Sequence, residues 1–173
     1  MDFAGSVPVI PSFMNITIRA YDAADWDAIC RIHDAARPRE LEGSVDPSAF
    51  LALADTFEAE GLFDADVWVA ELEGTLARFI AASPAEITWL YVDPALTRRG
   101  VARALTTWVL DRAPGEVELE VLDGNTAARA FYESLGFVHR STATGKLAGN
   151  ESYQVTGHTL VWGRPSRPVG PSR

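Results

Sequence analysis

The segment that most constrains this chain is an apolar run that leads through a basic, glycine-containing turn into a helical pattern. The three parts cover residues 87–92, 98–102 and 101–112. Amides at a helix N-terminus are unpaired and lie at the positive end of the helix dipole, and Gly100 lets an anion approach the backbone closely. Three arginines add positive charge at this corner: Arg98, Arg99 and Arg103. The sequence therefore predicts a phosphate-binding turn between a strand and a helix.

A second motif follows a strand-like alternation at residues 117–121. It covers residues 125–137, where Asn125 opens an alanine-rich helical segment that carries Tyr132 and ends in a Gly-Phe pair. Together, the two motifs resemble the GNAT superfamily of acyl-CoA N-acetyltransferases. The resemblance is specific over residues 67–138 and weak elsewhere.

The glycine turn differs from the family pattern at its first position. That pattern reads Gln or Arg, two free positions, Gly, one free position, and then Gly or Ala. Thr97 stands first here, whereas Gly100 and Ala102 match. Because backbone amides are expected to do most of the pyrophosphate binding, Arg98 or Arg99 can supply the charge that Thr97 lacks.

Length and composition predict one domain. A chain of 173 residues with 47% apolar residues can form one well-packed core and is short for two. We expect this domain over residues 15–162, an irregular arm at 1–14, and a disordered tail at 163–173, where prolines and arginines predominate. The single cysteine, Cys30, cannot form an internal disulfide and is expected to be an inert thiol in a helix.

Charge and hydropathy favour a cytoplasmic protein without membrane or nucleic-acid partners. No segment approaches the roughly 20 consecutive apolar residues that a bilayer span requires. The formal net charge of −9 disfavours nonspecific attraction to nucleic acid or to anionic lipid, since both reward a basic face. It favours a neutral or cationic acceptor weakly, and surface acids that keep the protein soluble would explain it equally well.

The resemblance implies an α/β fold with a mixed, mainly antiparallel central sheet of six or seven strands and helices on both faces. Residue patterns along the chain predict a first strand at 16–19, a hairpin at 67–82 that turns at Glu73-Gly74, and a last strand within 153–162. Between the last strands, residues 141–151 are polar and contain two glycines, which is typical of a loop.

Two helices are expected before the hairpin. Asp22 is a plausible N-cap for the first, which Pro38 should limit. The second is expected from Asp46-Pro47 to Gly61, where glycine supplies the stop.

The resemblance also implies which residues hold acetyl-CoA. The backbone of Leu90, Tyr91 and Val92 is expected to pair with the pantetheine amides as an added strand would, in a gap where this strand splays away from its neighbour. The turn residues expected at the pyrophosphate are Arg98, Arg99, Gly100, Val101, Ala102, Arg103 and Ala104. Asn125 is expected to contact the cofactor or to cap its helix, and both roles are compatible.

Acetyl transfer to an amine requires a held cofactor, an oxyanion donor, an acid for the leaving thiolate and a base for the amine. An amide near Leu90 or Tyr91 is expected to donate to the thioester oxygen. Tyr132 occupies the position of the family's usual tyrosine acid. Glu86 precedes the glycine turn at the offset of the catalytic glutamate of the histone-acetyltransferase branch, although an exposed strand-end carboxylate or a water chain is an equal alternative.

The acceptor is less constrained. In similar proteins it is selected by the connection after the first helix and by the loop between the last strands, here residues 31–46 and 141–153. His33 is a weaker candidate for the acceptor pocket. The three histidines lack metal-ligand spacing, so no metal site is predicted.

The leading hypothesis is an N-acetyltransferase that transfers the acetyl group of acetyl-CoA to a primary amine of a small molecule or peptide. The alternatives are a catalytically silent CoA-binding or sensing module, or acetylation of a protein N-terminus or an aminoacyl-tRNA. A homodimer is compatible with the resemblance and is left open.

Overall fold

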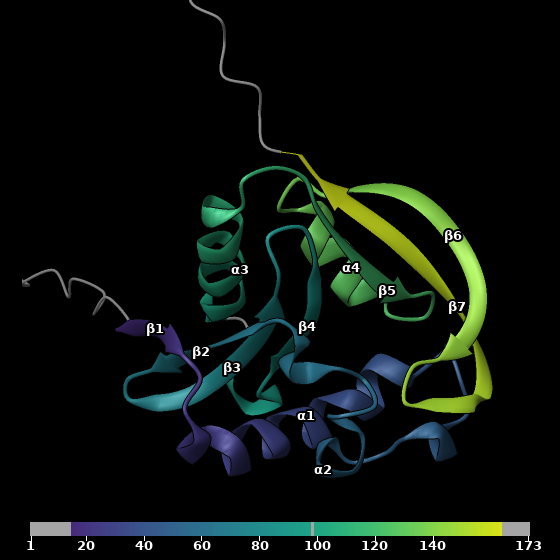
Figure 1. Cartoon of the computed structure of the whole chain (residues 1–173), viewed down its shortest axis with the longest axis horizontal. Coiled ribbons are helices and arrows are strands. Elements are labelled where there is room, and N and C mark those ends of the chain that lie inside the picture. Colours follow the sequence, from purple (N-terminus) through teal and green to yellow (C-terminus); the bar gives the residue numbers. More distant parts are fainter. Residues whose placement is uncertain (1–14, 98, 164–173) are drawn as a thin grey trace, which may run out of the picture.

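The computed structural model describes residues 15–97 and 99–163, and Figure 1 shows the arrangement of their strands and helices. The strands are β1 (Ile16–Ala20), β2 (Asp66–Leu72), β3 (Thr75–Ala82), β4 (Ile87–Val92), β5 (Val117–Leu122), β6 (Val138–Leu147) and β7 (Asn150–Trp162). The α-helices are α1 (Trp26–Leu41), α2 (Leu53–Thr56), α3 (Val101–Arg112) and α4 (Thr126–Glu133). Short 3-10 turns are η1 (Ala23–Asp25), η2 (Pro47–Ala49), η3 (Leu62–Asp64) and η4 (Pro94–Leu96).

The strands form two antiparallel sheets that touch at one point. Their orders are β1-β2-β3-β4 and β5-β7-β6. A parallel bridge joins Glu86 to Glu118, and the Glu118 amide donates to the Ala85 carbonyl at 2.9 Å. β4 and β5 therefore start together and separate toward their C-terminal ends, which confirms the expected mixed, mainly antiparallel arrangement with a gap beside β4.

Helices cover both faces of the four-stranded sheet. α1 buries Ile29 and Ile32 against Phe79 and Trp89 on one face. α3 buries Val101 and Leu105 in the cluster on the other face, which also contains residues of β5 and α4. Figure 1 shows α1 and α3 on opposite sides of this sheet.

The hairpin expected at Glu73-Gly74 is confirmed. Both residues have positive φ, 53° and 81°, and connect β2 to β3. Positive φ at both central residues is the geometry that matches the twist of a two-residue hairpin.

The first helix begins as expected and runs past the expected stop. The Asp22 carboxylate accepts from the Ala24 amide at 2.9 Å, and η1 leads into α1. Pro38 lies inside α1, which continues to Leu41. A proline removes one amide donor, and here the buried Leu41 and the bond from the Glu42 amide to the Pro38 carbonyl maintain the last turn.

The second helix, expected over residues 46–61, is wrong in extent. The structure has η2, an extended link and the short α2. Ala49 packs with Leu147 in one cluster, whereas Leu53 and Leu62 pack in another. Phe50 and Ala52 have extended backbone torsions, with ψ of 132° and 150°, and they separate η2 from α2.

The polar segment 141–151 forms the end of β6, a short turn and the start of β7, where a loop was expected. β6 and β7 pair over most of their length, and Gly149, with φ of 76°, lies at their turn. β6 is exposed at every position except Leu147, so no apolar alternation marks it. Figure 1 shows this hairpin curving along one side of the molecule.

The expected arm at 1–14 lies outside the described residues, as does the expected tail apart from Gly163. Among the helices of the described part, none has the length and apolar character needed to cross a bilayer.

Candidate active site

The gap between β4 and β5 contains a cavity of about 480 Å³, here called the gap cavity. All of β4 lines it, including Leu90, Tyr91 and Val92, which the sequence placed at the cofactor. Leu119 and Glu120 of β5 face it, and α1 contributes Glu40. Because β4 leaves the ladder beside β5 after the first bridge, its backbone borders the cavity and is open to an added strand.

A second cavity of about 470 Å³, the helix cavity, lies beside the turn that precedes α3. Gly100, Ala102 and Arg103 line it, and Gly100 has φ of 74° with open space where a Cβ would stand. Leu90, Val92, Thr97 and Tyr132 line both this cavity and the gap cavity, so the two are continuous.

The turn residues differ in how they meet this cavity. Val101 is fully buried in the core and Arg99 is exposed. Arg103 is exposed and donates from Nη2 to the Ser134 hydroxyl at 2.8 Å. Ala104 was expected to offer its amide to the pyrophosphate. In the structure this amide donates to the Gly100 carbonyl at 3.0 Å. Arg98 lies outside the described residues.

Tyr132 stands where the two cavities join. It is 8% exposed and contacts Phe131 and Phe137, with ring centroids 5.3 Å and 5.5 Å away. Burial raises the pKa of its phenol well above the ordinary value, an effect that nearby Glu40 reinforces and Arg78 opposes. The phenol of Tyr132 is therefore neutral near pH 7 and borders the space where the sequence expected a thioester.

Asn125 lies where it can fill both roles expected from the sequence, the cap of its helix and a contact to the cofactor. Its Oδ1 accepts from the Ala128 amide at 3.2 Å, which makes it the N-cap of α4. The residue also lines the gap cavity.

Glu86 is not brought together with Tyr132. It is exposed, sits at the bridge where β4 and β5 meet, and is not among the residues that line the cavities described here.

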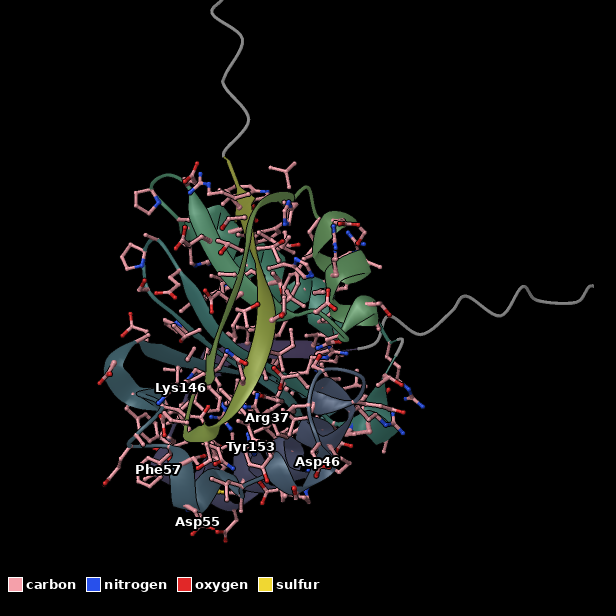
Figure 2. All side chains as sticks on the ribbon, turned by 90° about the vertical axis from the view of Figure 1, so that its right-hand side faces the viewer. Arg37, Asp46, Asp55, Phe57, Lys146 and Tyr153 are labelled. Atoms are coloured by element: carbon pink, nitrogen blue, oxygen red, sulfur yellow. The ribbon has the colours of Figure 1, made fainter. Side chains whose placement is uncertain are left out.

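A third cavity of about 320 Å³, the hairpin cavity, lies beneath the β6–β7 hairpin. Figure 2 shows Lys146, Arg37 and Tyr153 near the lower end of the hairpin. Five charged residues line the cavity: Arg37, Glu40, Glu60, Glu120 and Lys146. Trp89, Tyr91 and Glu120 line this cavity and the gap cavity alike, so the two communicate across the β4–β5 gap.

An ionic network lies at that junction. Arg37 Nη1 donates to Glu40 at 2.9 Å and to the Tyr91 hydroxyl at 3.0 Å, and Tyr91 donates to the same carboxylate oxygen. Burial raises the pKa of Glu60, and the nearby Arg37 opposes that effect. The i, i+3 spacing of Arg37 and Glu40 was visible in the sequence, but nothing local linked it to Tyr91.

Glu120 is the functional candidate that sequence reasoning missed. It is exposed and lines both the gap and hairpin cavities, and its carboxylate has no hydrogen-bond or ion-pair partner among the described residues. Alternation along 117–121 places it on the face of β5 opposite the core, but only the splayed strands bring that face to a cavity.

His33 is buried against Trp89 and Tyr91 and is not among the residues that line the three cavities. Burial lowers the pKa of its imidazole, and Nδ1 pairs with Asp34 at 2.8 Å. Within residues 15–97 and 99–163, no group of three or more His, Cys, Asp or Glu side chains is placed to hold a metal ion.

Comparison with known proteins agrees with this arrangement. The acetyltransferase (GNAT) family matches residues 26–137. An uncharacterized N-acetyltransferase of Escherichia coli K12, YafP, is 35% identical over 126 residues, which cover 71% of this chain and 81% of that protein.

Solved structures share the fold at lower identity. A GCN5-related N-acetyltransferase from Rhodopseudomonas palustris superposes with a TM-score of 0.70 at 21% identity, covering 87% of this chain and 98% of the other. The acetyltransferase yncA of Salmonella typhimurium, solved with acetyl-CoA, gives 0.60 at 21% identity, covering 91% and 99%. From the family match and the identity to YafP, the chain belongs to the acetyltransferase (GNAT) family.

Proposed function

We propose that this protein transfers the acetyl group of acetyl-CoA to a primary amine of a small molecule or peptide. The observation that carries the proposal is the position of Tyr132, a buried phenol at the junction of the helix cavity and the gap cavity. One cavity borders a glycine turn suited to phosphate, and the other borders the open backbone of β4.

Acetyl-CoA would lie across both cavities. Its pyrophosphate would meet the amides around Gly100 and Ala102 with Arg99 and Arg103 nearby, and Arg98 belongs to the same proposed site. Its pantetheine arm would follow β4 from Val92 toward Leu90. Asn125 borders the route of the arm while it caps α4.

The proposed acetyl transfer uses an oxyanion donor, an acid and a base. The amine nitrogen attacks the thioester carbon, and an amide of Leu90 or Tyr91 stabilises the oxyanion, a contact whose loss typically costs about 3 kcal/mol. The carbon–sulfur bond breaks, its electron pair stays on sulfur, and the Tyr132 hydroxyl gives the sulfur a proton. A base removes one proton from the attacking nitrogen.

Glu120 is the better-placed base. Its carboxylate borders both the gap cavity and the hairpin cavity, so it lies between the proposed thioester and the space for an acceptor. Glu86, which the sequence suggested for this role, lies at the closed end of the gap and would need a water chain to reach the same nitrogen. Both carboxylates belong in the test.

The hairpin cavity is the proposed acceptor site. Glu40, Glu60 and Glu120 give it carboxylates that suit an ammonium group, and the exposed Lys146 borders the same space. An alkylamine has a pKa of about 10, so it arrives charged and must lose a proton before attack. A cavity with a free carboxylate serves both steps.

The experiment is calorimetric titration of the full-length protein with acetyl-CoA and with CoA, followed by thiol release against a panel of primary amines. We expect binding of both ligands and amine-dependent release. Binding without release for any amine would favour the silent CoA-binding module. Absence of binding would overturn the assignment of the two cavities to acetyl-CoA.

A further inference from the structure

A buried arginine that lines the helix cavity has two guanidinium nitrogens without a hydrogen-bond partner in the described part of the chain. Arg78 lies on β3 opposite Val92 and is 4% exposed. Among the described residues, its Nε and Nη1 have no hydrogen-bond acceptor although both atoms are buried. A buried guanidinium without an acceptor is costly, so a residue of this kind suggests that a ligand atom completes its environment.

The surroundings of Arg78 are positive or neutral. The described residues that line the helix cavity include Arg78 and the exposed Arg103 but no carboxylate. Arg103 already donates to Ser134, whereas the buried Nε and Nη1 of Arg78 have no such contact within residues 15–97 and 99–163. The cavity is therefore suited to a group that carries or develops negative charge.

Tyr132 is the polar residue that lies close enough to Arg78 to be affected by the charge of the guanidinium. It shares the helix cavity with Arg78, and the two interact electrostatically. Burial lowers the pKa of Arg78 to about 10, which still leaves it a cation near neutral pH, and the interaction with Tyr132 opposes part of that effect.

The next step rests on the proposed function, in which acetyl transfer releases a thiolate. This thiolate is an anion that could lie beside Arg78. A thiol has an ordinary pKa of roughly 8.5 to 10 and a phenol one of about 10, and burial raises the pKa of Tyr132 further. Proton transfer from this phenol to a departing thiolate is therefore uphill. A fixed cation beside the pair stabilises the negative charge whether sulfur or the phenol oxygen carries it.

We propose that Arg78 is a catalytic residue that contacts the sulfur end of CoA and stabilises the leaving thiolate together with Tyr132. As the nitrogen–carbon bond forms and the carbon–sulfur bond breaks, the electron pair moves to sulfur beside the guanidinium. Tyr132 then gives sulfur its proton and recovers one from solvent. Arg78 keeps its own protons throughout.

The test compares CoA with desulfo-CoA, which lacks only the sulfur. In the wild-type protein, the thiol of bound CoA should titrate at a lower pH than that of free CoA, followed by the ultraviolet absorbance of the thiolate. At a pH between the two values CoA should bind more tightly than desulfo-CoA, by about tenfold for each unit by which the pH exceeds the pKa of the bound thiol.

Two variants locate the effect. Arg78→Met should abolish the preference for CoA over desulfo-CoA while desulfo-CoA still binds, and Arg78→Lys should keep part of it. The matched control is Arg103→Met, which removes an arginine from the same cavity. It should weaken both ligands to the same degree and leave the preference intact.

The outcomes separate this proposal from the one on which it rests. An unshifted thiol in the wild-type complex, or an undiminished preference in Arg78→Met, would overturn the role of Arg78 while leaving CoA binding intact. The titration of the wild-type complex needs no variant, so it tests the proposal even if Arg78→Met does not fold. Failure of the wild-type protein to bind either ligand would overturn both proposals.

Discussion

Arg37 and Tyr91 join α1 to β4, with the guanidinium Nη1 donating to the phenol oxygen at 3.0 Å on the wall of the hairpin cavity. Glu40 accepts from both residues. The contact links residues far apart in the sequence and holds α1 against the edge of the gap.

Removing either partner should destabilise the fold by different amounts. Tyr91→Phe deletes one hydroxyl and should lower the free energy of unfolding by about 1 kcal/mol. Arg37→Met leaves the Glu40 carboxylate without its cation and should cost about 3 kcal/mol or more. Urea denaturation measures both. The exposed Arg140, which pairs with Glu116 and Glu118, is the control, and Arg140→Met should cost under about 1 kcal/mol.

Tyr132→Phe should lower kcat by about 10² to 10⁴, because the variant loses the proton donor for the leaving sulfur. The ring contacts with Phe131 and Phe137 remain, so CoA affinity and thermal stability should change little. Thiol release and calorimetry measure the two effects. A variant with normal kcat would exclude Tyr132 as the acid.

Glu120→Gln should reduce kcat by a similar factor of about 10² to 10⁴ if this carboxylate is the base. Glu118→Gln is the matched control, since Glu118 lies on the same face of β5 but borders none of the three cavities. Glu86→Gln should have a smaller effect than Glu120→Gln. The reverse order of these two would return the role to Glu86.

Gly100→Ala should weaken CoA binding by about tenfold, or 1.4 kcal/mol. Its φ of 74° is unfavourable for alanine, and a Cβ would project into open space beside the glycine turn. Gly74→Ala is the control, because Gly74 has φ of 81°, equally open surroundings and a place in the β2–β3 turn. Both variants should lose about 1 to 2 kcal/mol of stability, and only the first should lose affinity.

The ion pair between Asp25 and Arg19 should make the free energy of unfolding fall at low pH. A hydrogen bond from Arg19 holds the pKa of Asp25 below its usual value. A lowered folded-state pKa contributes stability above the unfolded value of about 3.9, and this contribution is lost as pH falls through the folded value. Asp25→Asn should therefore cost about 1 kcal/mol at pH 7, a figure kept small because Arg19 is partly exposed, and progressively less below pH 4. Denaturation of both proteins at several pH values measures the difference in their free energies of unfolding. A difference that grew at low pH would refute the prediction.

Local features of the chain were readable from the sequence because they depend on neighbours along the backbone. The Glu73-Gly74 turn, the Asp22 cap and the strand-to-helix passage at Gly100 follow from positive φ, side-chain capping and periodicity. The motif that contains Tyr132 predicted a site residue, and the structure places that residue between two cavities.

The errors arise where packing overrode local preference. The segment expected as a second helix is interrupted where Phe50 and Ala52 take extended torsions, and its apolar residues pack in two different clusters. Pro38 remains helical, and Leu41 is buried beyond it. β6 carries no alternation because its side chains are exposed on both faces, and its pairing with β7 holds it instead.

The sequence by itself determined the family resemblance, the glycine turn and the position of Tyr132 in its motif. Only the tertiary structure decided that Arg78 faces the same cavity as Tyr132, that Glu120 rather than Glu86 borders the open gap, and that Arg37 reaches Tyr91. The physical reason is that turns and helix starts depend on local torsions and hydrogen bonds. The environment of a buried charge depends on which strands and helices meet around it, and those lie far apart along the chain.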